Sequence, residues 1–111
     1  MIYLASPYSS ADPAIVQQRF EAATRYVAYY FRLGVPLLSP IVYCHPIART
    51  HSLPGDALFW QFLNEELVMR SSAMWVLKLP GWESSAGVTS EIALARRLDI
   101  PLHFKEPLAN G

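Results

Sequence analysis

Short apolar runs that alternate with helical segments are the feature that most restricts how this chain can fold. The runs cover residues 2–5, 35–38, 73–79 and 100–104, and their composition and length predict strands. Helical spacing is found between them, over residues 13–33, 57–70 and 86–98, and Asp12 and Asp56 stand at the first two starts as N-caps. This order predicts an α/β, Rossmann-like (flavodoxin-like) three-layer sandwich with a small parallel sheet of four to five strands.

Two segments depart from the simple alternation. Residues 39–55 hold Pro40, Pro46, Pro54 and Gly55 without a clear period, which predicts a long loop, and loops of this length in compact domains are usually functional or disordered. The helix that follows is apolar nearly all round, which indicates burial on two sides. Apolar residues make up 52% of the chain and charged ones only 16%, so we expect a homodimer or a higher homo-oligomer.

Length and charge exclude several classes of protein. A chain of 111 residues predicts a single domain over residues 1–111. Nine basic residues balance nine acidic ones without a cluster, so nucleic acid and anionic membranes are not expected partners. No apolar run reaches the ~20 residues of a membrane span. A lone cysteine, Cys44, and a start that lacks the basic region of a signal peptide favour a cytoplasmic location.

Cys44, His45 and His51 form the one group that suggests a metal site. Their spacing matches neither a helical i, i+4 pair nor a Cys-x-x-Cys knuckle, and there is no second thiol. We therefore expect no metal and no cofactor. Either histidine could face a substrate, and the sequence assigns neither of them a role.

Glu91 is the most informative single residue. It lies at the edge of the apolar stripe of helix 86–98, and Leu94 and Ala95 follow it at i+3 and i+4, so it has no basic partner one turn on. The loops 6–11 and 80–87 follow the first and third strands, where ligands bind in such folds, and should be neighbours. This places Tyr3, Ser85 and Glu91 in one predicted site. A solvated helix residue remains the simpler reading of Glu91.

Two motifs carry a family resemblance over essentially the whole chain. Tyr3-Leu-Ala-Ser-Pro-Tyr8 and Gly81-Trp-Glu-Ser-Ser-Ala-Gly-Val-Thr-Ser-Glu91 resemble the nucleoside 2-deoxyribosyltransferase superfamily, and within it an uncharacterised bacterial and phage subfamily. The chain is also similar to the 2′-deoxynucleoside 5′-phosphate N-hydrolases of that superfamily. The resemblance implies that Glu91 attacks the anomeric carbon, that Tyr3 belongs to the site, and that Ser85 contacts a 5′-phosphate.

The resemblance also leaves one position in question. The family's helical aspartate, which assists proton transfer to the leaving base, falls on Glu65 by an ungapped count, with Asn64 beside it. Glu65 could serve as this acid, whereas Asn64 could not, and Glu65 is equally a surface carboxylate. The residues expected to bind the substrate are Ser6, Tyr8, Trp82, Ser84, Ser85 and Gly87. Capping explains the two serines of the 80–87 loop equally well, and packing explains Tyr3 and Trp82.

The resulting expectation is cleavage or transfer at the N-glycosidic bond of a 2′-deoxynucleoside 5′-monophosphate or related nucleoside, with a glutamate nucleophile. Such bonds break through an oxocarbenium-like state, which a carboxylate stabilises. A non-catalytic nucleotide-binding or sensor module is the alternative from another class, and an NAD-type glycohydrolase is a third. In each case the partner is a small nucleoside or nucleotide.

Overall fold

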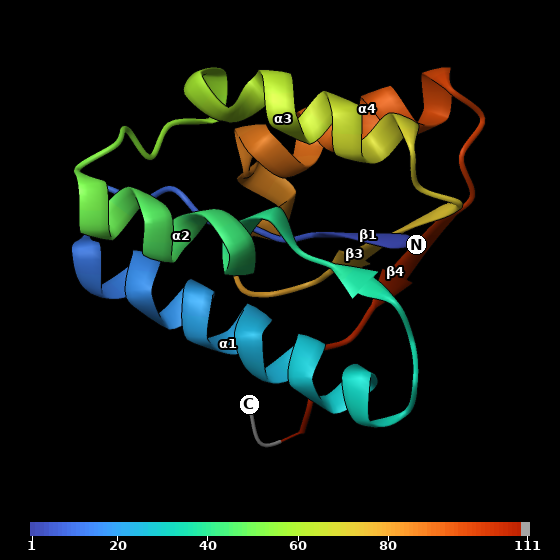
Figure 1. Ribbon diagram of the computed structural model, residues 1–111, viewed down its shortest axis with the longest axis horizontal. Coiled ribbons are helices and arrows are strands. Elements are labelled where there is room, and N and C mark those ends of the chain that lie inside the picture. Colours follow the sequence, from blue (N-terminus) through green and yellow to red (C-terminus); the bar gives the residue numbers. More distant parts are fainter. Residues whose placement is uncertain (110–111) are drawn as a thin grey trace.

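The structure, a computed structural model, describes residues 1–109, apart from the side chain of Ala57. Four parallel strands form one sheet in the order β2-β1-β3-β4, and helices cover it on both sides (Figure 1). The predicted α/β three-layer fold is confirmed. The elements in chain order are β1 (Ile2–Ala5), α1 (Pro13–Arg32), β2 (Leu37–Leu38), α2 (Pro40–His51), α3 (Ala57–Met69), β3 (Ala73–Leu77), the short 3₁₀ helix η1 (Trp82–Ser84), α4 (Ala86–Arg97) and β4 (Leu102–Lys105).

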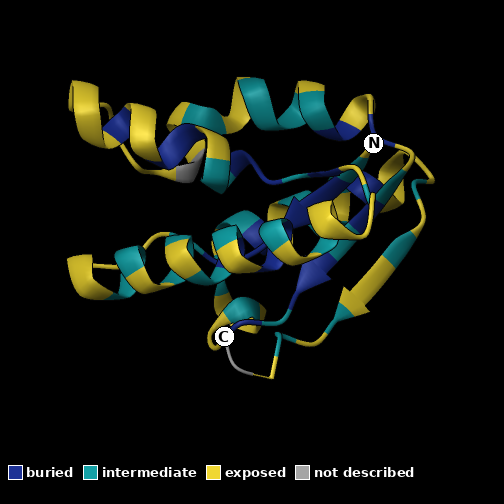
Figure 2. Ribbon diagram, turned by 60° about the horizontal axis from the view of Figure 1, so that its bottom comes forward, coloured by how far each residue is buried: buried dark blue, intermediate teal, exposed yellow. Residues whose placement is uncertain are grey.

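The alternation of side chains along β1 and β3 divides the core into two halves. Tyr3 and Met74 face α3 and α4, whereas Leu4 and Leu77 face α1. All four are 1% exposed or less, because successive residues of a strand point to opposite faces and both faces are covered by helices. The buried strands lie at the centre of the view in Figure 2, and β4 at the sheet edge is more exposed.

The helix starts follow the sequence closely. The Asp12 side chain accepts a hydrogen bond from the backbone of α1, and Pro13 occupies the first helical turn. Asp56 and Ser85 cap α3 and α4 in the same way. Each of these side chains satisfies an N–H group that has no partner inside its helix. Gly34, which follows the end of α1, takes the left-handed conformation with φ of 77°.

The predicted loop over residues 39–55 is wrong, because most of it forms α2. Ser39 caps this helix by accepting from the backbone N–H of Val42, and Pro40 lies in its first turn, where proline needs no N–H donor. Pro46 lies inside the helix and removes one internal hydrogen bond. The sequence does contain a pattern that indicates this helix, although the prolines suggest a loop. Ile41, Cys44, His45 and Ala48 recur at helical spacing and are buried or half-buried.

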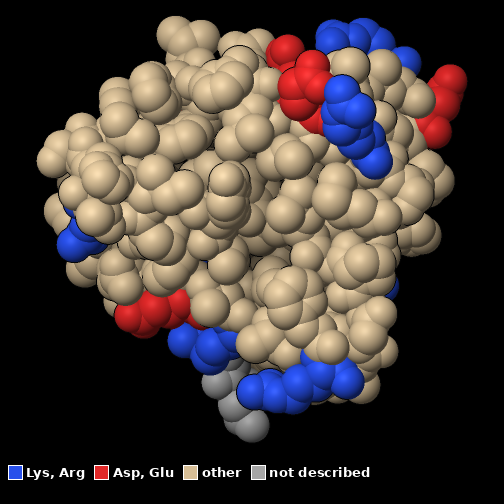
Figure 3. Space-filling view, viewed as in Figure 1, with Lys and Arg blue, Asp and Glu red and all other residues tan. Residues whose placement is uncertain are grey.

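The outer face of α3 is strongly apolar and exposed. Leu58 is 78% exposed, Phe62 66% and Met69 57%, and in the view of Figure 3 uncharged atoms cover most of the surface while charged groups gather near its margins. Among the described residues no helix is long and apolar enough to cross a membrane.

Candidate active site

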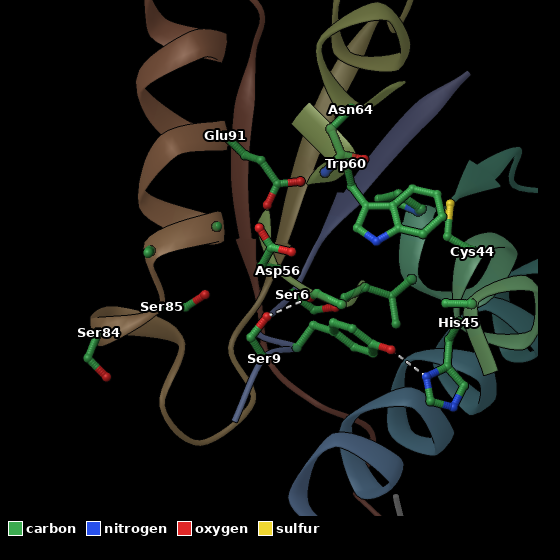
Figure 4. A pocket seen from close by; sticks show the side chains of 17 residues that line it. Ser6, Ser9, Cys44, His45, Asp56, Trp60, Asn64, Ser84, Ser85 and Glu91 are labelled. Carbon is green, nitrogen blue, oxygen red and sulfur yellow. Dashed lines mark hydrogen bonds between the residues drawn. The ribbon is translucent and has the colours of Figure 1, made fainter. Parts of the chain in front are cut away.

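A cavity of about 350 Å³ opens at the carboxyl ends of the strands. Its walls come from the segment after β1, from α2, from the start of α3 and from the N-terminal turns of α4 (Figure 4). In parallel sheets this edge collects ligand-binding loops from several elements. The residues that line the cavity are Ser6, Tyr8, Ser9, Pro40, Ile41, Cys44, His45, Ala48, Gly55, Asp56, Trp60, Asn64, Ser84, Ser85, Ala86, Gly87 and Glu91.

Glu91 is held in this cavity by Tyr3. The Tyr3 hydroxyl donates a hydrogen bond to Glu91 Oε2. Burial raises the pKa of Glu91 to about 7, although the hydrogen bond from Tyr3 acts in the opposite direction. Glu91 is the sixth residue of α4, beyond the first turn in which the helix dipole acts, so the dipole does not keep this carboxyl group ionised. A carboxyl group that titrates near neutral pH in a cleft is a candidate catalytic group.

Tyr3 itself does not reach the cavity. It is fully buried, and burial, followed by the charge of Glu91, raises its pKa well above the usual tyrosine range. Tyr3 therefore stays protonated and serves as a fixed hydrogen-bond donor to Glu91. It is a positioning residue rather than a group that touches a ligand.

Gly87 leaves space between Glu91 and the start of α4. A methyl group placed on Gly87 would lie 4.0 Å from Glu91 Oε1 and 3.9 Å from Ser85 Oγ. Both side chains therefore border the same small volume. Ser85 Oγ accepts a hydrogen bond from the backbone N–H of Val88, which leaves its hydroxyl hydrogen available for a ligand.

Arg19, which the sequence did not single out, ties together the two loops that build this edge. Its guanidinium donates to the carbonyl of Ser9 at 2.8 Å and to the carbonyl of Pro80 at 3.3 Å. The prediction that these loops are neighbours is confirmed. Gly81, with φ of 91°, passes so close that an added Cβ would lie 2.6 Å from Arg19 Nη2, so a side chain at this position would break the contact.

On the opposite wall Tyr8 and His45 form a hydrogen-bonded pair. The Tyr8 hydroxyl lies 2.6 Å from His45 Nδ1, and His45 Nε2 lies 3.3 Å from Gln17 Oε1; Figure 4 draws the first contact as a dashed line. The imidazole also stacks on Phe20 with ring centroids 4.1 Å apart. Burial, and then the charge of Arg49, lower the pKa of His45, so the ring is neutral at pH 7.

Asp56 and Trp60, which sequence reasoning missed as site residues, also line the cavity. In Figure 4 the carboxylates of Asp56 and Glu91 both point into it, and the Trp60 indole forms part of its wall. Asp56 Oδ2 accepts the capping hydrogen bond from Phe59, so Oδ1 faces no helix N–H. The indole N–H of Trp60 donates to the carbonyl of Pro54, which leaves the ring faces for contact.

Three residues expected in the site lie elsewhere or point away. Glu65 does not border the cavity; it borders a groove between α3 and α4, which Glu91 also borders, and accepts a hydrogen bond from Gln61. Trp82 packs against Phe104 and borders a different hollow. Ser84 borders the cavity, but its hydroxyl donates to the carbonyl of Gly81 and points away from the centre in Figure 4.

Two buried polar atoms of the cavity wall have no hydrogen-bond partner within the described residues. They are Ser6 Oγ and Asn64 Oδ1. Ser6 is only 5% exposed. Because an unpaired buried polar atom costs free energy, such atoms in a cavity indicate a bound molecule or water that pairs with them. Cys44 borders the same wall, and the structure over residues 1–109 shows no group of three side chains suited to a metal ion.

The comparisons with known proteins identify the family alone. A family model described as a domain of unknown function (DUF1937) matches residues 1–105, and the chain belongs to this family. No curated protein matches the chain.

Proposed function

We propose that the protein cleaves or transfers at the N-glycosidic bond of a 2′-deoxynucleoside or its 5′-monophosphate, with Glu91 as the nucleophile. The observation that carries this proposal is the Glu91 carboxyl group, which borders the cavity, has no basic partner among the described residues and accepts a hydrogen bond from Tyr3. The likeness of the Gly81–Glu91 motif to the nucleoside 2-deoxyribosyltransferase superfamily supports the same chemistry.

The reaction requires an ionised Glu91. An Oε atom attacks C1′ as the C1′–N bond breaks, and the electron pair of that bond remains on the base nitrogen, which takes up a proton. The product of this step is a glycosyl ester of Glu91 and a free base. Water, or the nitrogen of a second base, then attacks C1′ and releases the carboxylate.

We assign the proton transfer to Asp56 rather than to Glu65. Asp56 and Glu91 both border the cavity, and in Figure 4 both carboxyl groups point into it. Glu65 does not border the cavity; it borders the groove between α3 and α4, which Glu91 also borders, and it accepts a hydrogen bond from Gln61. The residue next to Glu65, Asn64, borders the cavity but has no acidic proton. Asp56 is thus the second carboxyl group in place: as the acid it gives its proton to the departing base, and as the resulting carboxylate it takes a proton from the attacking water.

A 5′-phosphate would meet hydroxyl groups and a helix N-terminus. Ser85 and the backbone N–H groups of Ala86 and Gly87 supply donors at the start of α4. None of the described residues that line the cavity is a lysine or an arginine. Comparing the affinities of nucleosides with those of their 5′-monophosphates therefore measures how much a phosphate contributes to binding.

The direct test is a chromatographic assay for free base. The purified protein is incubated with the common 2′-deoxynucleosides and their 5′-monophosphates, and Glu91→Ala serves as the negative control. Base release that the variant lacks supports the proposal. Absence of release from every substrate contradicts the proposal. Measurable nucleotide binding in that case favours the non-catalytic binding module, an alternative that the neutral Asn64 in the cavity wall supports.

The pH dependence of base release gives a further prediction. Because burial raises the pKa of Glu91 to about 7 and the nucleophile must be ionised, we expect the rising limb of kcat/KM against pH to have its midpoint near that value. Tyr3→Phe removes the hydrogen bond that lowers the pKa of Glu91, so the midpoint should move upward by about one unit. At pH 7 the ionised fraction of Glu91 then falls from about one half to about one tenth, so the variant should be roughly fivefold slower. A midpoint that stays in place would show that Tyr3 does not act through Glu91.

We further propose that a second copy of the chain covers the exposed apolar face of α3, formed by Leu58, Phe62 and Met69. An exposed apolar surface of this kind is unusual in a monomer. A cytoplasmic location is also a proposal, and its support is the single cysteine of the sequence.

A further inference from the structure

The hydrogen-bonding role of Tyr8 is fixed by a chain of side chains behind it. The Glu21 carboxylate can only accept, so Gln17 Nε2 donates to it, at 3.1 Å, and Gln17 Oε1 is left facing His45. His45 Nε2 must then carry the hydrogen and donate to Oε1. In the neutral ring Nδ1 is consequently an acceptor, and the Tyr8 hydroxyl donates to it.

The consequence for the cavity is that Tyr8 can only accept from a ligand. Its single hydrogen is committed to His45, which is 4% exposed and stacked on Phe20. The lone pairs of the Tyr8 oxygen remain, and Tyr8 borders the cavity.

The remaining side chains of the wall strengthen this bias. Asp56 presents a carboxyl oxygen that the helix cap does not use, and none of the described lining residues is a lysine or an arginine. The indole N–H of Trp60 is used by Pro54, so the ring offers a flat apolar face without a free donor. The wall around Tyr8 therefore offers a fixed acceptor beside a flat surface on which a heterocycle can stack.

We propose that this wall selects a heterocycle with an exocyclic amino group over one with a carbonyl group at the same position. An amino group donates to the Tyr8 oxygen and satisfies a fixed acceptor. A carbonyl oxygen in its place faces the Tyr8 lone pairs and leaves both atoms unpaired, which is the situation that buried sites reject most strongly. Adenine and cytosine are bases of the selected kind, and hypoxanthine and uracil are their carbonyl counterparts. The inference rests on the proposed nucleoside site and names its base.

Binding of free bases to the wild-type protein tests the inference without turnover. Isothermal titration calorimetry compares adenine with hypoxanthine and cytosine with uracil, and we expect the amino member of each pair to bind at least about tenfold more tightly. Tyr8→Phe keeps the ring and removes the oxygen, so the preference should fall to about threefold or less. Equal affinities in the wild-type protein, or an undiminished preference in the variant, would overturn the inference.

The variant His45→Phe shows whether the base preference depends on the fixed orientation of the Tyr8 hydroxyl or only on an intact site. The variant keeps an aromatic ring against Phe20 but removes the acceptor, so the Tyr8 hydroxyl is free to turn and donate. Affinity for hypoxanthine and uracil should then increase, which loss of structure cannot produce, and a uniform loss for all four bases would count against the inference. Free bases have no glycosidic bond, so this binding test does not depend on whether the protein cleaves nucleosides. A negative result here therefore does not contradict the proposed reaction, and a negative base-release assay does not contradict the base preference.

Discussion

Replacing Glu91 with glutamine is expected to eliminate base release and, at pH 8, to stabilise the protein. The carboxyl group is the nucleophile of the proposed reaction, and an amide cannot replace it, so we expect a loss of about 10³-fold or more in kcat. The amide still accepts the hydrogen bond from Tyr3, and ligand binding should be largely retained. Glu83→Gln, a change at an exposed position of the same motif, is the matched control and should leave the activity unchanged.

The gain in stability follows from the raised pKa of Glu91. Burial moves this pKa from 4.5 to about 7, so the folded protein binds more protons than the unfolded chain between these two values. The free energy of unfolding of the wild-type protein therefore decreases as the pH rises through this window. Glutamine does not ionise, so the variant should be more stable above pH 7, by at most about 3 kcal/mol, and equal to the wild type below about pH 4.

Urea unfolding at pH 4 and pH 8 measures this difference. A variant that is equally stable or less stable than the wild type at pH 8 would show that the carboxyl group is not held at a cost in the folded protein. A group that reduces stability and has no basic partner is the kind that is retained for function.

Replacing Asp56 with asparagine is expected to reduce base release about 100-fold, and Glu65→Gln to leave it within about twofold. Asparagine is a good N-cap and can accept the hydrogen bond from Phe59, so α3 should keep its start while the acidic proton is lost. Glu65→Gln removes a carboxylate of the same helix from the groove between α3 and α4, and is the matched control.

A substrate with a positively charged base shows whether Asp56→Asn loses activity because proton transfer is lost or because the fold is damaged. An N7-methylated purine leaves as a neutral base and needs no protonation, so Asp56→Asn should cleave its nucleoside at nearly the wild-type rate. A variant that is slow on both kinds of substrate would indicate that Asp56 only supports the fold. Loss of activity in Glu65→Gln instead would place the acid in the other groove.

The main features of the fold could be predicted from local patterns. Apolar runs, N-caps such as Asp12, and Gly34 after α1 are signals that act over a few residues, and the structure confirms the elements that they indicate. The helix α2 was missed because Pro40 and Pro46 resemble loop residues, although Pro40 lies at a helix start. The apolar residues of α2 recur at helical spacing in the sequence, but the prolines favour a loop and that pattern alone does not overrule them.

The site was predictable where the topology determines it. Adjacent parallel strands bring the loops after β1 and β3 together, and Tyr3 therefore meets Glu91. The contribution of α3 depends on how that helix is rotated over the sheet, which an all-round apolar helix does not reveal. Neighbouring residues of a helix point about 100° apart, and so Asn64 borders both the cavity and the groove between α3 and α4, while Glu65 borders the groove alone.

Aromatic side chains show the same limit. Trp82 follows β3 closely in the sequence, yet it packs against Phe104 at the edge of the sheet. Trp60 lies in a helix whose sequence suggested only burial, yet it borders the cavity. Both side chains are large enough to be placed by packing rather than by the nearest motif, so the tryptophan at the site could not be chosen from spacing.

Mass spectrometry of the protein after reaction with a 2′-fluorinated nucleoside tests the role of Glu91 most directly. The electron-withdrawing fluorine slows hydrolysis of a glycosyl ester, so the intermediate should accumulate. We predict a mass increase of one fluorinated sugar, located on the peptide that contains Glu91 and absent from Glu91→Gln. Base release without any such adduct, or an adduct on another residue, would contradict Glu91 as the nucleophile.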